Sequence, residues 1–463
     1  VEAVRYTEGK RQVKKQKKTT DGGKISRMAL SNLGRNKGKT VIVIVSLSLA
    51  IVLLNSIFTF TNAFDMDKYL ANFVSSDFVI ANAKYFNSEY SARKEELQES
   101  NLTESFIEAC EEQEGFEKGG RIYAATDQVG VKISDYKIPK NMPVNENGEL
   151  CWMWNGEKIP VTKLNEENYQ TMYYGADDFL FEKMEVYEGE KDLDVIKEKL
   201  ATGNYLLYAV STDDNGMVRK EDMVHHAGDK VTLSFPNGEE REVEILSVIK
   251  ENYYGLSTRY SVIFPYYTTA EVFRKDLSED YLMSYSFDVR DDREEAIQQF
   301  VKNYSEKTEP TMNYESKLKW SNEFESLKGM FTIIGCFLTF VVAVIGILNF
   351  INAILTSIVT RLRELAMLES IGMTKKQIIK MLTLEGIYYA GFTMISSLLI
   401  GMLMSVTILR VLTSQIWFMK YQFVIWPMLV TFPFLLVLGW LVPKAAYHFQ
   451  GKKSMIEQLK NAD

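Results

Sequence analysis

The residues that could do chemistry in this chain are few, and one short string comes nearest to a nucleotide site. Residues 34–40 read GRNKGKT. A phosphate loop has the form G-x-x-x-x-G-K-[ST] and lies between a strand and a helix. Here Leu33 stands where the first glycine should be, and a long apolar run follows. We therefore interpret the string as a basic segment beside a membrane and expect this chain to bind no cofactor.

Residues suited to metal binding or histidine-based catalysis are also scarce. The sequence holds 3 histidines, and His225 and His226 are adjacent, so they lack the i,i+4 spacing that places two rings on one helix face. No set of Ser, His and an acidic residue is evident. We expect surface histidines, no metal site, no catalytic residue and no nucleic-acid partner. The chain is not predicted to be an enzyme.

A binding element is indicated by residues 361–377, RLRELAMLESIGMTKKQ, which lie between two apolar runs. No Gly or Pro interrupts residues 356–371, so the preceding helix should continue through them. Gly372 is a helix stop, and Thr374 with Gln377 forms a capping box that begins the next helix. The apolar side would consist of Leu362, Leu365, Ala366 and Leu368. The side chains left free to meet a cytoplasmic partner would be Arg361, Arg363 and Glu364.

The hairpin should be held in place by four apolar stretches of the sequence, two before it and two after it. Each is nearly free of charge and long enough to cross a bilayer, for which roughly 20 helical residues suffice. They are residues 41–63, 330–355, 384–409 and 423–442. The first lies too far from the chain start, and lacks the small-residue cleavage site, to be a secretory signal. The sequence therefore predicts four transmembrane helices.

The charges between these helices set their orientation, because Lys and Arg near the ends of spans stay in the cytoplasm. Residues 1–40 hold 12 Lys and Arg against 3 Asp and Glu, residues 357–380 hold 5 against 2, and residues 443–463 hold 4 against 2. Residues 64–327 hold 29 against 53, a net charge of −24. We expect both termini and the hairpin in the cytoplasm of a bacterial plasma membrane, and the acidic block outside. Its carboxylates either attract a cationic ligand or form a solvated surface.

The outer block is predicted to be a mixed α+β domain with several antiparallel strands, because helical and alternating apolar patterns follow one another. The expected strands are 77–85, 121–126, 129–133, 204–210 and 284–290, the helices 102–115, 192–203 and 293–307, and a hairpin 228–251 turns at Pro236, Asn237 and Gly238. Cys110 and Cys151 either form a disulfide or remain free, and Cys336 lies in a span.

Apolar stripes extend from the spans into both ends of the outer domain. One stripe comprises Phe64, Met66, Tyr69, Leu70 and Phe73, and the other comprises Trp320, Phe324, Leu327 and Phe331. Both spacings predict helical stalks. Such helices either carry motion as stiff rods or serve as ordinary linkers.

Polar and small residues inside the spans predict helix packing. The third span places Gly386, Ala390, Thr393, Ser397, Gly401 and Ser405 mostly four residues apart, and the second does the same with Gly335, Thr339 and Ala343. Glu385 is either a functional carboxylate or one that reaches water or Lys380 at the interface. Pro433 should kink the fourth span. No polar path through the spans is apparent.

The hairpin carries a family resemblance. Asn352, Arg361, Arg363 and Glu364 follow the pattern N-x8-R-x-R-E-[LI]-[AG]-x-[LM]-x-[AS]-[IL]-G-[AM]-[TS], which resembles FtsX-like permeases, the membrane subunits of MacB-type ABC transporters. Residues 28–40 resemble the family's amphipathic entry helix. The order of one span, a large outer domain and three spans is also similar. The residues that would line one side of the entry helix are Ile25, Met28, Ala29 and Leu33.

The resemblance implies that the hairpin is a coupling helix, which docks into a dimer of separate ATPase subunits that bind ATP and Mg. The coupling residues would be Arg361, Arg363, Glu364, Leu365, Leu368, Gly372 and Thr374. The residues with polar or packing roles in the membrane would be Asn352, Glu385, Ser397, Gly401 and Ser405. Movement of the outer domain would serve export or antimicrobial peptide resistance, lipoprotein release, or regulation of an extracellular cell-wall hydrolase. A membrane-anchored receptor would need no coupling helix.

The chain begins without Met, and residues 1–5, VEAVR, echo residues 456–460, IEQLK. This echo suggests the C-terminal half of a permease with two such units, the second unit lying on the same long chain or in a homodimer.

The expected protein is an α-helical membrane protein with four transmembrane helices plus a large α+β extracytoplasmic domain between the first and second. Its expected parts are a tail or linker of a preceding unit (1–23, with the linker at 6–23), the entry helix and first span (24–63), a MacB-like outer domain with helical stalks (64–327), the second span (328–356), the coupling helix and turn (357–380), the third span (381–410), the fourth span (423–442) and a cytoplasmic tail (443–463).

Overall fold

The computed structural model describes residues 25–35, 37–86, 101–125, 128–135, 143–154, 157–213, 215–220, 223–251, 265–277 and 281–450. The segments 1–5, 6–23 and 456–460, on which the two-unit hypothesis rests, lie outside these residues. The chain divides into two compact units. The first comprises the described parts of Val1–Ala63, Phe331–Thr413 and Tyr421–Asp463, and the second comprises those of Phe64–Met330 and Ser414–Lys420.

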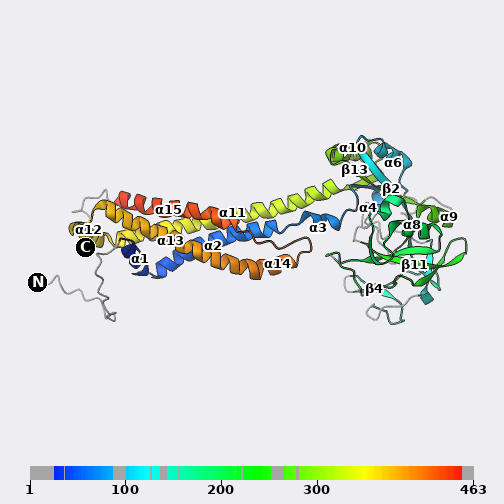
Figure 1. Ribbon diagram of the computed structural model, residues 1–463, viewed down its shortest axis with the longest axis horizontal. Helices are drawn as coiled ribbons and strands as arrows, with labels where there is room; N and C mark the ends of the chain where they lie inside the picture. Colours follow the sequence, from blue (N-terminus) through cyan, green and yellow to red (C-terminus); the bar gives the residue numbers. More distant parts are fainter. Residues whose placement is uncertain are drawn as a thin grey trace. The chain divides into compact units, whose positions relative to one another are not determined.

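Within the described residues, four helices are long and apolar enough to cross a membrane (Figure 1). They are α2 (Lys37–Asn62), α11 (Lys317–Thr360), α13 (Lys375–Met404) and α15 (Trp426–Gln450). Helix α13 continues through a π-helical turn at Ser405–Leu409 into α14 (Arg410–Ser414). The short helices α1 (Ile25–Arg35) and α12 (Leu362–Ser370) precede α2 and α13. The chain is therefore a multi-pass membrane protein in which each expected span is helical.

The helices of the first unit pack through small residues. Helix α13 lies against α15 and α2. A methyl group built on Gly386 would lie 2.0 Å from the carbonyl oxygen of Gly439, and one built on Gly401 would lie 2.0 Å from the Cε atom of Met428. Such close approach of backbones is how helices associate in lipid. Buried polar residues follow the same side: Thr393 and Ser397 of α13, and Ser405 at the start of the π-helical turn.

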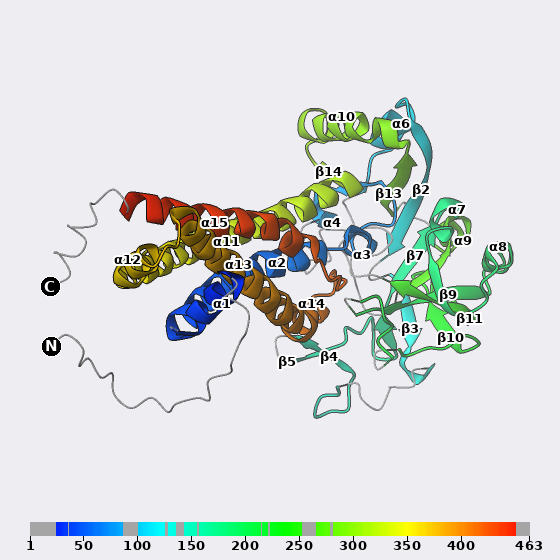
Figure 2. The same ribbon diagram turned by 60° about the vertical axis from the view of Figure 1, so that its left-hand side comes forward.

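The second unit is built on one large, mostly antiparallel sheet (Figure 2). Within the described residues its strand order is β14-β1-β13-β2-β7-β12-β9-β11-β10-β3-β6, with β8 paired to β11. The strands are β1 (Phe78–Asn82), β2 (Phe116–Ala125), β3 (Gly130–Lys132), β6 (Asn168–Gln170), β7 (Met172–Ala176), β8 (Glu185–Gly189), β9 (Tyr205–Ser211), β10 (Lys230–Ser234), β11 (Glu240–Glu251), β12 (Pro265–Thr269), β13 (Leu282–Val289) and β14 (Met312–Ser316). A separate hairpin joins β4 (Cys151–Trp154) to β5 (Glu157–Pro160).

Apolar residues cover both faces of this sheet. Successive residues of a strand point to opposite faces, and on β1 Phe78 belongs to one buried cluster while Val79 belongs to the other. The helices of the unit are α3 (Met66–Ala71), α4 (Ala83–Phe86), α6 (Glu104–Glu111), α7 (Asp178–Phe181), α8 (Leu193–Ala201), α9 (Ala270–Asp276) and α10 (Glu294–Lys307). Phe106 of α6 and Ile297 of α10 lie in the first cluster, whereas Leu200 of α8 lies in the second. The unit is thus the large α+β domain that the sequence predicts.

The local features of this domain agree with the sequence patterns, with two exceptions. The strand expected over residues 77–85 ends at Asn82, and residues 83–86 form helix α4 instead. The hairpin of β10 and β11 turns through Gly238 at φ +82°, and Gly203 follows α8 at φ +74°. The prediction of surface histidines is wrong for His225, which is 1% exposed and lies 2.8 Å from the hydroxyl of Tyr266. Burial without a hydrogen bond would be costly for an imidazole, and this hydroxyl supplies the bond.

Cys110 and Cys151 are both buried and free, so the structure holds no disulfide between them.

The chain enters and leaves the second unit through two paired strands. Strands β1 and β14 are antiparallel at one edge of the sheet, with Phe78 opposite Ser316. Helix α11 begins at Lys317, directly after β14, and the ammonium group of Lys317 lies 3.2 Å from a carboxylate oxygen of Asp77. Helix α11 therefore begins directly at the edge pair of the sheet.

The two stalks differ from each other. The stripe before the second span is helical, as predicted, because it belongs to α11. The prediction that the first span continues as one helical stalk is wrong: α2 ends at Asn62, and Phe64 pairs with Met419 in an isolated bridge. Asp65 then begins the short helix α3 by accepting a hydrogen bond from the backbone N–H of Lys68. An N-cap of this kind requires non-helical backbone, which interrupts the helix.

Aromatic side chains join both stalks to residues 414–420 within the second unit. We name this group the stalk cluster; its members are Phe64, Tyr69, Phe73, Trp320, Phe324, Trp417 and Phe418. Tyr69 stacks on Trp417 with ring centroids 5.7 Å apart, and Phe73 stacks on Trp320 at 4.1 Å. The backbone N–H of Asp65 also donates to the carbonyl of Phe418.

Candidate functional site

The cytoplasmic hairpin begins with a break in the helix. Helix α11 ends at Thr360, and Arg361 adopts φ −113° and ψ 12° before α12 starts at Leu362. The prediction of uninterrupted helix over residues 356–371 is therefore wrong at one residue. The break coincides with a long-range contact, since the side chain of Arg361 turns toward α13 and meets Glu385 there. Helix propensity is a property of the local sequence, so it cannot indicate a partner that lies 24 residues away.

The other end of α12 is closed by backbone hydrogen bonds. Gly372 has φ +107°, its N–H donates to Glu369, and the N–H of Met373 donates to Leu368. This pair of bonds is a Schellman motif, which favours glycine because only glycine adopts positive φ without strain. Helices α12 and α13 are thus joined by a turn of fixed geometry.

The first turn of α13 is capped as the sequence indicates. The hydroxyl of Thr374 accepts a bond from the N–H of Gln377, and the side-chain oxygen of Gln377 accepts one from the N–H of Thr374. This reciprocal box satisfies two backbone donors that would otherwise lack partners.

The inward side of α12 is anchored by apolar packing. Leu365 is 3% exposed and belongs to a buried cluster with Ile358 of α11 and with Ile378 and Leu382 of α13. Leu368 packs partly buried against the same cluster. The two leucines that the family resemblance assigns to ATPase coupling, Leu365 and Leu368, therefore face the chain's own helices.

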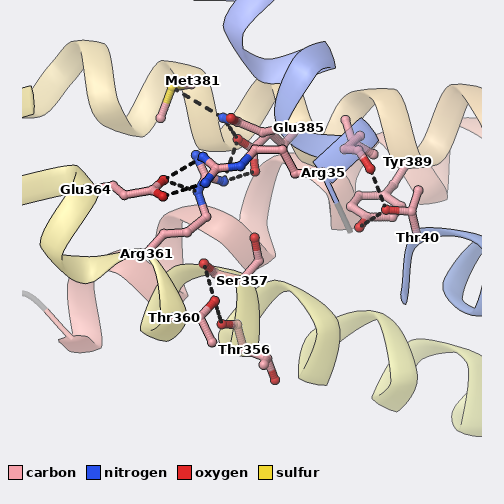
Figure 3. A network of polar contacts seen from close by, with 12 residues as sticks. Arg35, Thr40, Thr356, Ser357, Thr360, Arg361, Glu364, Met381, Glu385 and Tyr389 are labelled. Carbon is pink, nitrogen blue, oxygen red and sulfur yellow. Dashed lines mark hydrogen bonds and ion pairs between the residues drawn. The ribbon is translucent and has the colours of Figure 1, made fainter. Parts of the chain in front are cut away.

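Polar side chains connect the hairpin to α1, and Figure 3 labels four of them: Arg35, Arg361, Glu364 and Glu385. The guanidinium of Arg361 donates to both carboxylate oxygens of Glu385, at 3.1 and 3.3 Å. Asn32 donates to Glu385 at 2.6 Å, and Arg361 donates to Glu364 at 3.4 Å. Arg35 completes the group by donating to both oxygens of Glu364, at 2.7 and 2.9 Å. We name these residues the polar network; it ties α1, α12 and α13 together.

The polar network corrects three predictions. Arg361 and Glu364 were expected to be free for a partner, but their side chains are 11% and 37% exposed and are paired within the chain. Two interpretations of Glu385 were left open, and the one in which it reaches water or Lys380 is wrong, because its side chain is 6% exposed and is paired with Arg361. A buried carboxylate is stable only with such partners. Glu364 lies outside the candidate spans, and the hydrogen bonds from Arg35 hold the pKa of its carboxyl group below the usual value.

Asn32 and Arg35 are residues that sequence reasoning missed. Their helix was predicted from its amphipathic pattern, but their partners lie 353 and 329 residues further along the chain. No local spacing signals a contact of that range.

The outward side of the hairpin is apolar and basic. Met367 is 57% exposed and Ile371 is 84% exposed, and both follow Arg363 at intervals of four residues, which places the three on one side of α12. Lys375 and Lys376 are exposed just beyond the turn. We name these five residues the turn face. The sequence analysis identified Arg363 but missed Met367 and Ile371, although their four-residue spacing could have revealed them.

The remaining predicted residues lie apart from the hairpin. Asn352 is exposed on α11, where its carbonyl accepts a bond from the hydroxyl of Thr356. Ser397 donates to the carbonyl of Met394 within α13, and the hydroxyl of Ser405 lies 2.9 Å from that of Tyr421. Within the described ranges, no group of three His, Cys, Asp or Glu side chains is placed to hold a metal ion.

Comparison with known proteins assigns the part of the chain that contains the hairpin. Residues 336–452 match the model of the FtsX-like permease C-terminal family. This segment, which includes α12, α13 and α15, is therefore an FtsX-like permease C-terminal domain. No curated protein matches the chain.

Two solved structures are similar to the chain at low identity. The periplasmic region of MacB from Actinobacillus actinomycetemcomitans is 11% identical, with 54% of this chain and 92% of that chain covered and a TM-score of 0.29. The extracellular domain of the noncanonic ABC-type transporter YknZ from Gram-positive bacteria is 11% identical, with 52% and 99% covered and a TM-score of 0.27. Likenesses of this size carry no argument about the function of this chain.

Proposed function

We propose that this chain, with its FtsX-like permease C-terminal domain, is the permease subunit of an ABC transporter and couples ATP hydrolysis in a separate cytoplasmic ATPase to movement of its outer domain. The observation that carries the proposal is the turn face. Ile371 is 84% exposed on a rigid helical hairpin that lies outside the candidate spans. Met367, one helical turn earlier, is 57% exposed, so the two side chains form an exposed apolar patch with basic neighbours, and such patches mark interaction sites.

The chemistry of the turn face suggests the kind of groove that receives it. Met367 and Ile371 would fill an apolar groove, and Arg363, Lys375 and Lys376 would face acidic side chains at its rim. The excess of basic residues in residues 357–380 favours the cytoplasmic side for this hairpin. Such a groove belongs to a dimer of ATPase subunits, and ATP and Mg are bound there rather than by this chain.

The internal bonds of the hairpin would let it move as one body. The Schellman motif at Gly372 and the capping box at Thr374 fix the turn, and the Arg361–Glu385 pair fixes α12 against α13. A push on α12 would therefore displace α13. It would also reach α11, a single helix of 44 residues that begins directly after β14 at the edge of the outer sheet.

The second docking hairpin that an ATPase dimer needs would come from a second FtsX-like unit, on the same long chain or in another copy. The substrate on which the moving outer domain acts would be an exported compound or an antimicrobial peptide. Regulation of a cell-wall hydrolase and lipoprotein release would use the same coupling with a different partner outside.

Co-purification with the ATPase encoded beside this chain tests the proposal. Replacing one central apolar residue of an interface typically costs about 2 kcal/mol or more, so Ile371→Asp should weaken association by roughly 30-fold. The matched control is Met217→Asp, which places the same charge on an exposed apolar residue of the outer domain. Equal association of both variants and the wild type would refute docking through the turn face.

A further inference from the structure

We infer that helix α1 positions the coupling hairpin, with Asn32 and Arg35 setting the pose of α12 through the carboxylates Glu385 and Glu364. The inference rests on the proposed function of the hairpin and adds α1 to the moving part. Asn32 and Arg35 act through other residues, so both are positioning residues. Three observations support this role: the hydrogen bonds that Asn32 and Arg35 make, the packing that fixes α1, and the small apolar contact of α12 with its neighbours.

Arg35 holds Glu364 in a defined orientation. Two different nitrogens of its guanidinium donate to the two carboxylate oxygens, at 2.9 and 2.7 Å. A fork of this kind restricts rotation as well as distance, which a single-point contact does not do. Glu364 lies in the first turn of α12. The contact therefore fixes the rotation of α12 about its own axis.

Asn32 supports the other end of the network. Its side-chain nitrogen donates to the Glu385 oxygen that also accepts from Arg361. Glu385 is thus held between α1 on one side and the start of α12 on the other. Removing the amide would leave Arg361 as the member of the polar network that still bonds the buried carboxylate. A buried carboxylate binds its cation in a less defined orientation when fewer hydrogen bonds hold it.

Helix α1 is itself fixed, so it can serve as a reference for α12. Ala29 and Leu33 are buried in the same apolar cluster as Met381 of α13. The hydroxyl of Thr40, at the start of the first span, donates to the carbonyl of Leu33. Through α1, displacement of α12 would reach α2 as well as α13 and α11.

Apolar packing alone holds α12 weakly. Leu365 is its one deeply buried residue, while Leu362 and Leu368 are partly buried. A helix of 9 residues with so narrow an apolar contact can tilt and rotate unless polar contacts restrain it. The turn face lies opposite that contact, so a loss of restraint would change how Ile371 is presented to the ATPase.

The test compares Arg35→Glu, Glu364→Arg and the double exchange in nanodiscs with the ATPase. Each single variant should lower stimulated ATP hydrolysis by about three- to tenfold, the range for residues that modulate coupling. The double exchange should restore part of the lost activity, because the pair with residue 35 is re-formed with opposite polarity while Arg361 loses the carboxylate of Glu364. Arg27→Glu is the matched control on the exposed side of α1 and should match the wild type. Equal activity of Arg35→Glu and Arg27→Glu, or failure of the double exchange to restore activity, would overturn the inference.

A second measurement uses the chain without the ATPase. Amide hydrogen exchange in α12 should be about tenfold faster in Arg35→Glu than in Arg27→Glu, with unchanged exchange in α13. Unchanged exchange in α12 would overturn the inference whatever the ATPase does. If exchange rises while the wild-type chain fails to bind or stimulate any ATPase, the positioning role of α1 stands and the proposed function fails.

Discussion

The guanidinium of Arg361 lies 3.1 Å from the carboxylate of Glu385, and this pair joins the first residue before α12 to the interior of α13. Both side chains are nearly inaccessible to solvent. A charge placed on a membrane helix is stable here because its partner comes from a break in the neighbouring helix. The break at Arg361 and the buried Glu385 are therefore two parts of one feature.

Removal of Arg361 should destabilise the first unit strongly. Arg361→Ala leaves the Glu385 carboxylate buried without its cation, which costs about 3–5 kcal/mol when a buried pair is broken from one side. Lys376→Ala, which removes an exposed cation at the start of α13, is the control and should change stability little. Thermal unfolding followed by tryptophan fluorescence in nanodiscs measures both. Equal melting temperatures for the two variants would contradict the structural role of the pair.

The packing of α13 on α15 should tolerate no side chain at Gly386. The methyl group of Gly386→Ala would lie 2.0 Å from the carbonyl oxygen of Gly439, so the helices must separate. Overpacking of this kind costs about 1–3 kcal/mol. Gly391→Ala, in the same helix with nothing within 4 Å of the added atom, should be neutral or stabilising by up to about 1 kcal/mol. Thermal melting that ranks the two variants in the reverse order would show that this contact is absent.

The thiol of Cys110 should be unreactive in the folded protein. Burial raises its pKa to about 12, and alkylation requires the thiolate. Mass spectrometry after maleimide treatment at pH 8 should find Cys110 unlabelled in the native chain and labelled in denaturant. Because the folded pKa lies above the ordinary value of 9.0, the thiol's contribution to stability is complete below pH 9 and is lost as the pH rises toward 12. Rapid labelling of the native chain would contradict this burial.

Removal of Trp417 should loosen the stalk cluster. Its ring stacks on Tyr69 with an interplanar angle of 9°, and such aromatic pairs contribute about 0.5–1.5 kcal/mol beyond the burial of area. Trp417→Ala should speed amide exchange in residues 414–420, whereas Trp417→Phe retains a ring and should show a smaller effect. If alanine and phenylalanine behave alike, stacking at this position does not hold the segment.

The sequence predicted the features that depend on neighbours along the chain. The end of α12 at Gly372 and the start of α13 at Thr374 were predictable because the hydrogen bonds that define them join residues within five positions of each other. The packing of the small residues of α13 against another helix was predictable from their regular spacing. Gly203 and the turn before Gly238 were recognisable for the same reason.

The features that escaped prediction depend on distant residues. Arg361 was expected to be free because its partner Glu385 lies in the next span, and Asn32 was overlooked because its contact spans 353 residues. The first stalk was expected to be one helix, but Phe64 pairs with Met419 from the far end of the chain. His225 was placed on the surface because nothing near it in sequence indicates Tyr266.

The central claim is that ATP hydrolysis by a separate ATPase docked on the hairpin moves the outer domain. The most direct measurement is amide hydrogen exchange of the nanodisc complex of this chain with its ATPase, compared between ATP and ADP. The account predicts that ATP changes exchange at the edge strands β1 and β14 in the wild type, and that Ile371→Asp abolishes the change. Identical exchange at these strands with ATP and ADP, while the wild-type complex hydrolyses ATP, would contradict it.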